Sequence, residues 1–404
     1  MRHEALDGLR GLAAFAVLVL HVWMFHHGDA GRPPRDLLDR AIGEMRLGVP
    51  LFFVLSGFLL YRPFAGAVLD GAPRPSLGRY ALRRAARILP AYLATLAGAF
   101  VLLRLLDHPR QIALDQLPVF LLFAQNQFDA TRAHLDPPMW SLCVEVSFYV
   151  LLPLLAVVAG RLGATRGRQL VVPAALGAIG AGCTAAAALW HWPATVTTSL
   201  LLHLLEFGAG MAVAVLLHQR PLRRATGLVL AAAGMALVLG DASWHGYQVG
   251  PQQPRLLLHD APASLGFALL VAAVVGTSWR LTALSRGPAR WLGTISYGVY
   301  LIHFPVILAL RETGHWSSSL GLALLAVGGL SVALATASWL LLERPVVRWA
   351  HRATVRRRAC QPVAEAELVP GRPIRPPRSR GRGMRPGDLH VLRPQPAAGP
   401  GPRA

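Results

Sequence analysis

Ten long apolar blocks constrain the fold of this chain more than any other feature. Each approaches roughly 20 residues, the length that a helix needs to cross the hydrocarbon core of a bilayer. Hydrophobic residues make up 54% of the 404 residues and charged residues only 15%. We therefore predict an all-α integral membrane protein, a bundle of about ten transmembrane helices, and exclude a soluble multidomain enzyme. The blocks lie near residues 11–28, 47–63, 90–106, 139–159, 170–190, 199–217, 226–240, 261–279, 291–311 and 319–341.

Arginine residues gather in alternate loops between these blocks, and this sets the expected orientation. The short loops after the second, fourth, sixth and eighth blocks carry more arginine than those on the other side, although residues 32–46 hold a cluster on the wrong side. Basic loops usually stay in the cytoplasm. We therefore expect a multi-pass protein of the plasma membrane, surrounded by membrane lipids, with both termini in the cytoplasm. The stretch 117–123 is too short to span and is expected to be re-entrant or interfacial.

The apolar pattern ends near residue 350, which divides the chain into a membrane domain (1–350) and a basic tail (351–404). The tail holds twelve arginines and three acidic residues among many Pro and Gly. Such a segment cannot bury enough apolar surface to fold, so we expect it to be disordered. Its charge suits anionic lipid; a tail without function is an equal alternative, and nucleic-acid binding is not expected. Three scattered cysteines without CxxC spacing indicate neither a metal site nor a disulfide framework.

Arg10 and His21 stand at the two ends of an otherwise apolar or small stretch in the first block. Eleven helical steps place the two side chains on nearly the same face and about 16 Å apart. His21 would then lie past the middle of the bilayer, where an imidazole is costly unless it faces protein or a wet cavity. A catalytic role and a purely structural one remain open.

Two further groups of charged residues are candidates for a functional role. Arg84 and Arg87, three residues apart on one helical face, suit forked hydrogen bonds to phosphate, although an ordinary basic flank explains them as well. Glu145, in the block that opens with Trp140, is expected at a depth similar to that of His21. A carboxylate there could orient an imidazole base and stabilise its charged form. The alternative is a structural ion pair.

The ninth block carries Ser296, Tyr300 and His303 at helical spacing. Together they make one polar stripe on an apolar helix, which must face other helices or a cavity. Either structural hydrogen bonding or contact with a substrate would account for the stripe. Glu343, followed by Arg344 and Pro345, is expected to form a local ion pair where the tenth helix stops.

Taken together, these segments resemble the membrane-bound acyltransferase 3 family. The resemblance runs in order over about residues 3–350, and its pieces are weak singly but specific as a set. It implies transfer of an acyl group, usually acetyl, from cytoplasmic acyl-coenzyme A to a hydroxyl of a surface glycan, a lipid-linked sugar or a secreted metabolite. It assigns catalytic weight to Arg10, His21 and Glu145, and nucleotide-phosphate contact to Arg84 and Arg87. The matching pieces are Arg10-x10-His21, Phe52-Phe53-x-x-Ser56-Gly57-Phe58, Arg84-x-x-Arg87, Trp140-Ser141-Leu142-x-Val144-Glu145, Ser296-Tyr297-x-x-Tyr300-x-x-His303 and Glu343-Arg344-Pro345.

The mechanism expected from these residues makes His21, oriented by Glu145, the general base that activates the acceptor hydroxyl. Trp140 and the ninth-block stripe are candidate acceptor contacts, no metal is expected, and an acyl-histidine intermediate stays open. A related group acylates macrolide sugars, which gives an alternative acceptor. A proton-coupled transporter that uses the intramembrane His and Glu is the alternative of another class, and a non-catalytic scaffold is a third. The sequence does not indicate an oligomeric state.

Overall fold

The computed structural model describes residues 4–27, 36–245, 260–277, 279 and 282–359, and every regular element in this part of the chain is a helix. The described residues up to Arg356 form one compact unit. Eight of the described helical segments are long and apolar enough to cross a membrane, and two shorter apolar ones, Leu200–Leu216 and Ala261–Gly276, accompany them. Each of the ten predicted blocks therefore coincides with a helix, which confirms an all-α membrane protein.

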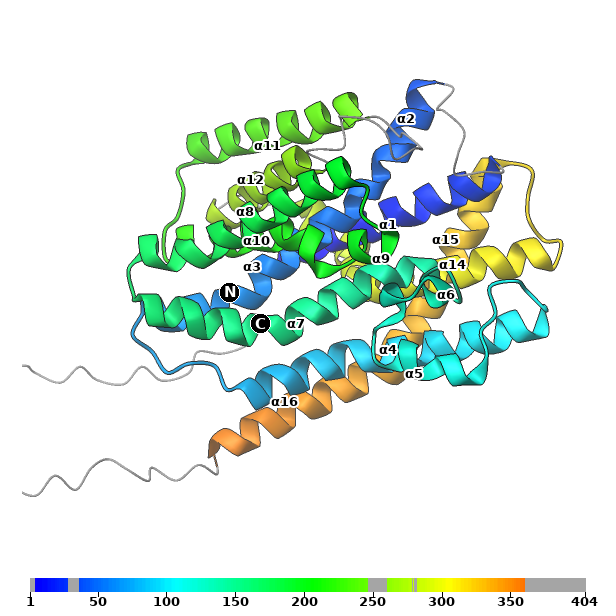
Figure 1. Ribbon diagram of the computed structural model, residues 1–404, viewed down its shortest axis with the longest axis horizontal. Helices are drawn as coiled ribbons and strands as arrows, with labels where there is room; N and C mark the ends of the chain where they lie inside the picture. Colours follow the sequence, from blue (N-terminus) through cyan, green and yellow to red (C-terminus); the bar gives the residue numbers. More distant parts are fainter. Residues whose placement is uncertain (1–3, 28–35, 246–259, 278, 280–281, 360–404) are drawn as a thin grey trace, which may run out of the picture. The chain divides into compact units, whose positions relative to one another are not determined.

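The long helices follow the predicted order along the chain (Figure 1). Short helices occupy the connections, among them α2 (Leu37–Gly43), α5 (Leu117–Leu121) and the 3-10 turn Leu200–His203 that leads into α10. The long helices are α1 (Glu4–His26), α3 (Gly48–Leu69), α4 (Leu77–Leu105), α7 (Trp140–Leu162), α8 (Arg166–Trp190), α10 (Leu204–Leu216), α11 (Arg224–His245), α12 (Ala261–Gly276), α14 (Gly287–Glu312), α15 (Leu320–Ser338) and α16 (Arg344–Ala359).

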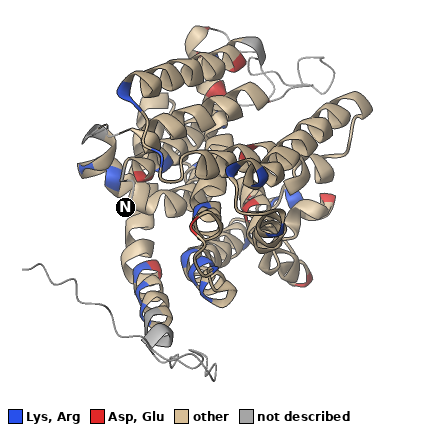
Figure 2. Cartoon of the chain, turned by 90° about the vertical axis from the view of Figure 1, so that its left-hand side faces the viewer, with Lys and Arg blue, Asp and Glu red and all other residues tan. Residues whose placement is uncertain are grey.

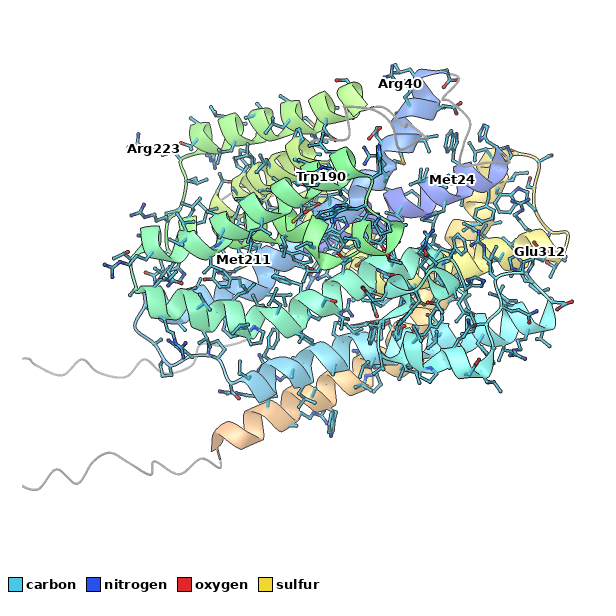
Figure 3. The ribbon with its side chains drawn as sticks, viewed as in Figure 1. Met24, Arg40, Trp190, Met211, Arg223 and Glu312 are labelled. Carbon is cyan, nitrogen blue, oxygen red and sulfur yellow. The ribbon has the colours of Figure 1, made fainter. Side chains whose placement is uncertain are left out.

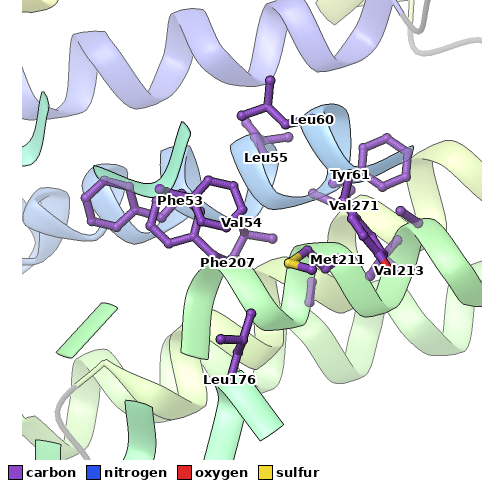
Figure 4. Close-up of a cluster of buried hydrophobic side chains, with 14 of the residues drawn as sticks. Phe53, Val54, Leu55, Leu60, Tyr61, Leu176, Phe207, Met211, Val213 and Val271 are labelled. Atoms are coloured by element: carbon purple, nitrogen blue, oxygen red, sulfur yellow. The ribbon is translucent and has the colours of Figure 1, made fainter. Parts of the chain in front are cut away.

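Helices α3 and α10 pack at the centre of the largest buried cluster (Figure 4). Phe53 of α3 stacks on Phe207 of α10, with ring centroids 5.0 Å apart. Two glycines let the backbones approach: a Cβ on Gly57 would collide with the backbone of Phe207, and one on Gly210 with the backbone of Val54. Small residues at such contacts are what brings transmembrane helices close, since lipid provides no hydrophobic drive between them.

The helical rod after α15 does not stop where the sequence predicted. Residues Trp339–Glu343 form a π-helical turn, and α16 continues from Arg344 to Ala359, beside α4 in Figure 1. Pro345 lacks an N–H and follows directly on the π turn, where the regular hydrogen-bond ladder is already interrupted. Residues 351–359 of the predicted tail are therefore helical, and residues 360–404 lie outside the described part of the chain.

The bundle has two chemically different ends. The basic end holds the start of α1 and the connections 70–76, 163–165 and 217–223; Figure 2 looks onto it, and blue segments there outnumber red ones. The opposite end holds the ends of α1, α8 and α14 and the starts of α3, α7, α10 and α12. Figure 3 marks the two ends with Arg223 at the left and Glu312 at the right.

Candidate active site

Two cavities enter the bundle, one toward each end. The opposite cavity, about 780 Å³, is lined by Val17, Leu20 and His21 in the second half of α1 and by the starts of α3, α7 and α10. The basic cavity, about 260 Å³, is lined by Arg10 and by the first turns of α4 and α16. Arg10 and His21, eleven residues apart on one helix, thus each contribute to a different cavity.

His21 is half-buried and forms a pair with His303 of α14. The Nδ1 atom of His21 lies 3.0 Å from Nε2 of His303, and the ring centroids are 5.1 Å apart. His303 has no exposed surface, and its Nδ1 lies 3.2 Å from the Val299 carbonyl oxygen. The polar stripe predicted in the ninth block therefore faces the first helix, and it brings a second imidazole to the predicted base.

The hydrogen bonds of this pair determine where its protons lie. A carbonyl oxygen can only accept, so Nδ1 of His303 carries a proton toward Val299. Nε2 of a neutral His303 is then an acceptor, and His21 donates its Nδ1–H to it. The Nε2 atom of His21 keeps its lone pair. An imidazole with a free Nε2 at the wall of a cavity is the arrangement that a general base requires.

The other members of the α14 stripe have different surroundings. The Ser296 hydroxyl donates to a carbonyl of its own helix at 3.0 Å and is fully buried. The Tyr300 side chain lines the opposite cavity; its hydroxyl lies 2.7 Å from Ser141 Oγ and donates to the Pro138 carbonyl at 2.8 Å. Trp140 lines the same cavity. Of the predicted acceptor contacts, Trp140 and Tyr300 are thus placed to meet a ligand, whereas Ser296 is not.

Glu145 does not meet His21, contrary to the expected pairing. Its Oε1 accepts hydrogen bonds of 2.6 Å from Ser56 Oγ and from the Tyr149 hydroxyl, and it lines the basic cavity. The depth argument placed both residues near the middle of the membrane, but depth does not determine which neighbours a helix face meets. The orienting group beside His21 is the imidazole of His303 instead.

The basic cavity gathers four arginines, Arg10, Arg83, Arg84 and Arg87, around one carboxylate, Glu145. Arg84 lies over the ring of Tyr149 at 6.0 Å, and Nε of Arg10 is buried without a hydrogen-bond partner. The excess of positive charge in a narrow space suits an anionic ligand, and planar guanidinium groups suit phosphate. The predicted phosphate contact Arg84 therefore lies in a fitting cavity.

Arg87 lines this cavity but is already engaged by protein groups. Its guanidinium donates to Glu343 Oε2 at 3.1 Å and to the Thr294 carbonyl at 3.0 Å, and it lies 5.0 Å from the ring of Trp339. Glu343 is fully buried, so the ion pair joins α4 to the π turn. Glu343 thus pairs with a distant helix rather than locally with Arg344, and Arg87 is fixed in a structural contact.

Sequence reasoning missed His203 and Glu206, which line the opposite cavity from the start of α10. Their spacing of three residues was the available signal: His203 Nδ1 lies 3.4 Å from Glu206 Oε1, and Glu206 is 4% exposed. A buried carboxylate in an apolar span marks a candidate functional site, as a buried histidine such as His21 does.

Comparisons with known proteins show what this chain is similar to. A family described as an acyltransferase domain matches residues 3–342. BcsY of Komagataeibacter xylinus is 28% identical over 88% of this chain and 85% of its own length. Acyltransferase MdmB of Streptomyces mycarofaciens is 27% identical over 86% of this chain and 92% of its own. The peptidoglycan O-acetyltransferase OatA of Listeria monocytogenes is 25% identical over 75% of this chain, which spans 49% of that protein. No solved structure matches.

Proposed function

Because the chain belongs to the acyltransferase 3 family, we propose that it moves an acyl group, most simply acetyl, from acyl-coenzyme A to a hydroxyl group. The acceptor is a surface glycan, a lipid-linked sugar or a secreted metabolite. The observation that carries this proposal is the pair of cavities in one bundle, one lined by four arginines and one with His21 in its wall.

The basic cavity fits the donor. Coenzyme A is a polyanion at one end and a thin, flexible arm at the other, so arginines at a mouth and a narrow path beyond it are the expected features. Arg84 and Arg10 offer donors that no ion pair uses among the described residues, and Nε of Arg10 is buried without a hydrogen-bond partner. With the basic end in the cytoplasm, the donor would enter from the side on which acyl-coenzyme A is made.

Each cavity has a tyrosine of α14 in its wall. Tyr297 lines the basic cavity and donates to the Ile88 carbonyl at 3.1 Å, and Tyr300 lines the opposite cavity. Three residues along a helix correspond to about 4.5 Å of rise. In the proposed mechanism the thioester moves along α14 from the basic cavity toward His21.

The chemical step then follows from the state of His21. Its Nε2 removes the proton of the acceptor hydroxyl while the oxygen attacks the thioester carbonyl. The C–S bond breaks as the ester forms, and the imidazolium returns the proton to the leaving thiolate. His303 holds the imidazole in the required tautomer through the 3.0 Å hydrogen bond. General-base assistance of this kind contributes about 10²–10⁴-fold to the rate.

A macrolide sugar is the alternative acceptor, and it leaves the donor site and the step at His21 unchanged. The similarity to MdmB over 92% of that protein favours keeping a Streptomyces-type metabolite among the candidates.

Coenzyme A binding to the purified full chain in detergent, measured by titration calorimetry, tests the donor site. We expect saturable binding that weakens in Arg84→Ala and is unchanged in Arg79→Ala, which lies on the same helix but does not line the cavity. Absence of coenzyme A binding would refute the proposal and favour a transporter. A second assay follows acetyl transfer from labelled acetyl-coenzyme A in membranes, which His21→Ala should abolish while the protein still inserts.

A further inference from the structure

The opposite cavity contains a carboxylate with an oxygen that no protein group uses. Glu206, in the first turn of α10, is 4% exposed and lines the cavity. Its Oε1 lies 3.4 Å from His203 Nδ1, but its Oε2 is buried without a hydrogen-bond partner. A buried anionic oxygen is costly when unpaired. A ligand in the cavity that donates a hydrogen bond to this oxygen would remove that cost.

The cavity also supplies aromatic surface near this carboxylate. Trp140, Trp192 and Tyr300 contribute to its lining, and the ring of Trp140 lies 5.3 Å from that of His203. Aromatic faces attract cations, and ring and carboxylate together form a site for a positively charged nitrogen. A neutral sugar would contact the rings and donate a hydroxyl hydrogen bond to the carboxylate, but it would lack the attraction between opposite charges.

The charges around the cavity also favour a positively charged ligand. Among the described residues that line it, Arg46 is the one arginine, and its guanidinium is paired with Asp260 and, at 3.0 Å, with Glu44. Two carboxylates therefore neutralise one arginine, and Glu206 adds further negative charge. The basic cavity shows the reverse, with four arginines around one carboxylate. The charged residues that line the two cavities thus differ in the sign of their net charge. This difference would direct an anionic donor to the basic cavity and a cationic acceptor to the opposite one.

We infer that the opposite cavity selects an acceptor that carries a protonated amine as well as hydroxyl groups, such as an amino sugar. Glu206 Oε2 accepts from the ammonium group, and the tryptophan rings flank it. A volume of about 780 Å³ is within the range of small-molecule sites and accommodates a sugar. The inference rests on the acyl transfer proposed above, because it names the class of acceptor for that same site.

The test is ligand binding by the purified full chain in detergent, observed by saturation-transfer NMR. The probes are D-glucosamine, which is cationic, and D-glucose and N-acetylglucosamine, which are neutral. We expect glucosamine to bind about tenfold more tightly than either neutral sugar, as for a hydrogen bond to a charged group. Glu206→Gln should remove this preference. Asp70→Asn, which alters a carboxylate at the basic end that is bonded to His218, is the matched control and should keep it.

Equal binding of the three sugars, no binding of any, or a preference that survives Glu206→Gln would overturn the inference. Coenzyme A titration on the same samples verifies that each variant is folded, and it separates the two proposals, because that binding occurs in the other cavity. If the Glu206→Gln variant misfolds and therefore loses coenzyme A binding, Trp192→Leu is used in its place. We expect the Trp192→Leu variant to bind glucosamine more weakly and to keep its coenzyme A binding.

Discussion

Replacing His303 with alanine is the sharpest test of the histidine pair. His303 is expected to act through His21, because it accepts the hydrogen bond from the Nδ1–H of His21 and thereby leaves Nε2 of His21 free as a base. A neutral hydrogen bond contributes about 0.5–1.5 kcal/mol, and each 1.36 kcal/mol corresponds to tenfold in rate. His303→Ala should therefore lower kcat by about 2- to 13-fold. His21→Ala removes the base itself and should cost about 10²–10⁴-fold.

The assay is transfer of labelled acetyl from acetyl-coenzyme A in membranes, with expression of each variant measured in parallel. The double variant His21→Ala/His303→Ala distinguishes a positioning residue from a second catalytic group. If His303 acts only through His21, the double variant is no slower than His21→Ala alone. Ser296→Ala is the matched control on the same helix, since its hydroxyl bonds only to its own backbone, and it should retain near-normal rates.

Two results would refute this reasoning. A His303→Ala variant as slow as His21→Ala would contradict the modest loss expected from one neutral hydrogen bond. A double variant slower than either single one would show that the two imidazoles act independently.

Three further predictions concern stability, measured as thermal unfolding in detergent. Glu343→Ala removes the ion-pair partner of Arg87. Because the Arg87 side chain is 23% exposed, the loss of stability should fall toward the lower end of the about 3–5 kcal/mol that breaking a buried ion pair costs. An unchanged unfolding midpoint would show that the pair contributes nothing. Burial raises the pKa of Asp136 well above its usual value, so the folded state binds a proton there and the contribution of this carboxyl to stability falls as pH rises from about 4. Asp136→Asn should therefore unfold at a higher temperature than wild type near neutral pH and lose that advantage near pH 4. A pH-independent difference would contradict this. Gly210→Ala should lower the midpoint because its Cβ meets the backbone of α3, whereas Gly78→Ala, with nothing within 4 Å, should not.

The sequence predicted the helices well because membrane spans are decided by local hydropathy over a fixed length. The ten apolar blocks needed no knowledge of neighbours. Their ends were less certain: α4 begins at Leu77 rather than near residue 90, because Arg79, Arg83 and Arg84 extend the helix beyond the apolar stretch. Charged residues are good helix formers, so hydropathy alone cannot find this start.

The site was only partly predictable, for reasons of geometry. His21, Arg84 and Tyr300 line cavities, as polar residues on apolar helices suggested. Their partners were not predictable. Glu145 was assigned to His21 by depth, but the rotation of α7 turns it toward Ser56 of α3, and its other partner, Tyr149, lies one turn along α7 itself. Contacts between helices depend on rotation and neighbour order, which one sequence does not reveal.

The π turn at residues 339–343 has a consequence for comparing proteins of this kind. Such a turn holds one residue more than the regular ladder, and each residue corresponds to about 100° of rotation. The direction in which every later side chain points therefore depends on the number of residues in this turn. A homologue one residue shorter there would carry the same Glu-Arg-Pro letters yet direct its glutamate away from α4, so aligned letters in this region need not be equivalent positions.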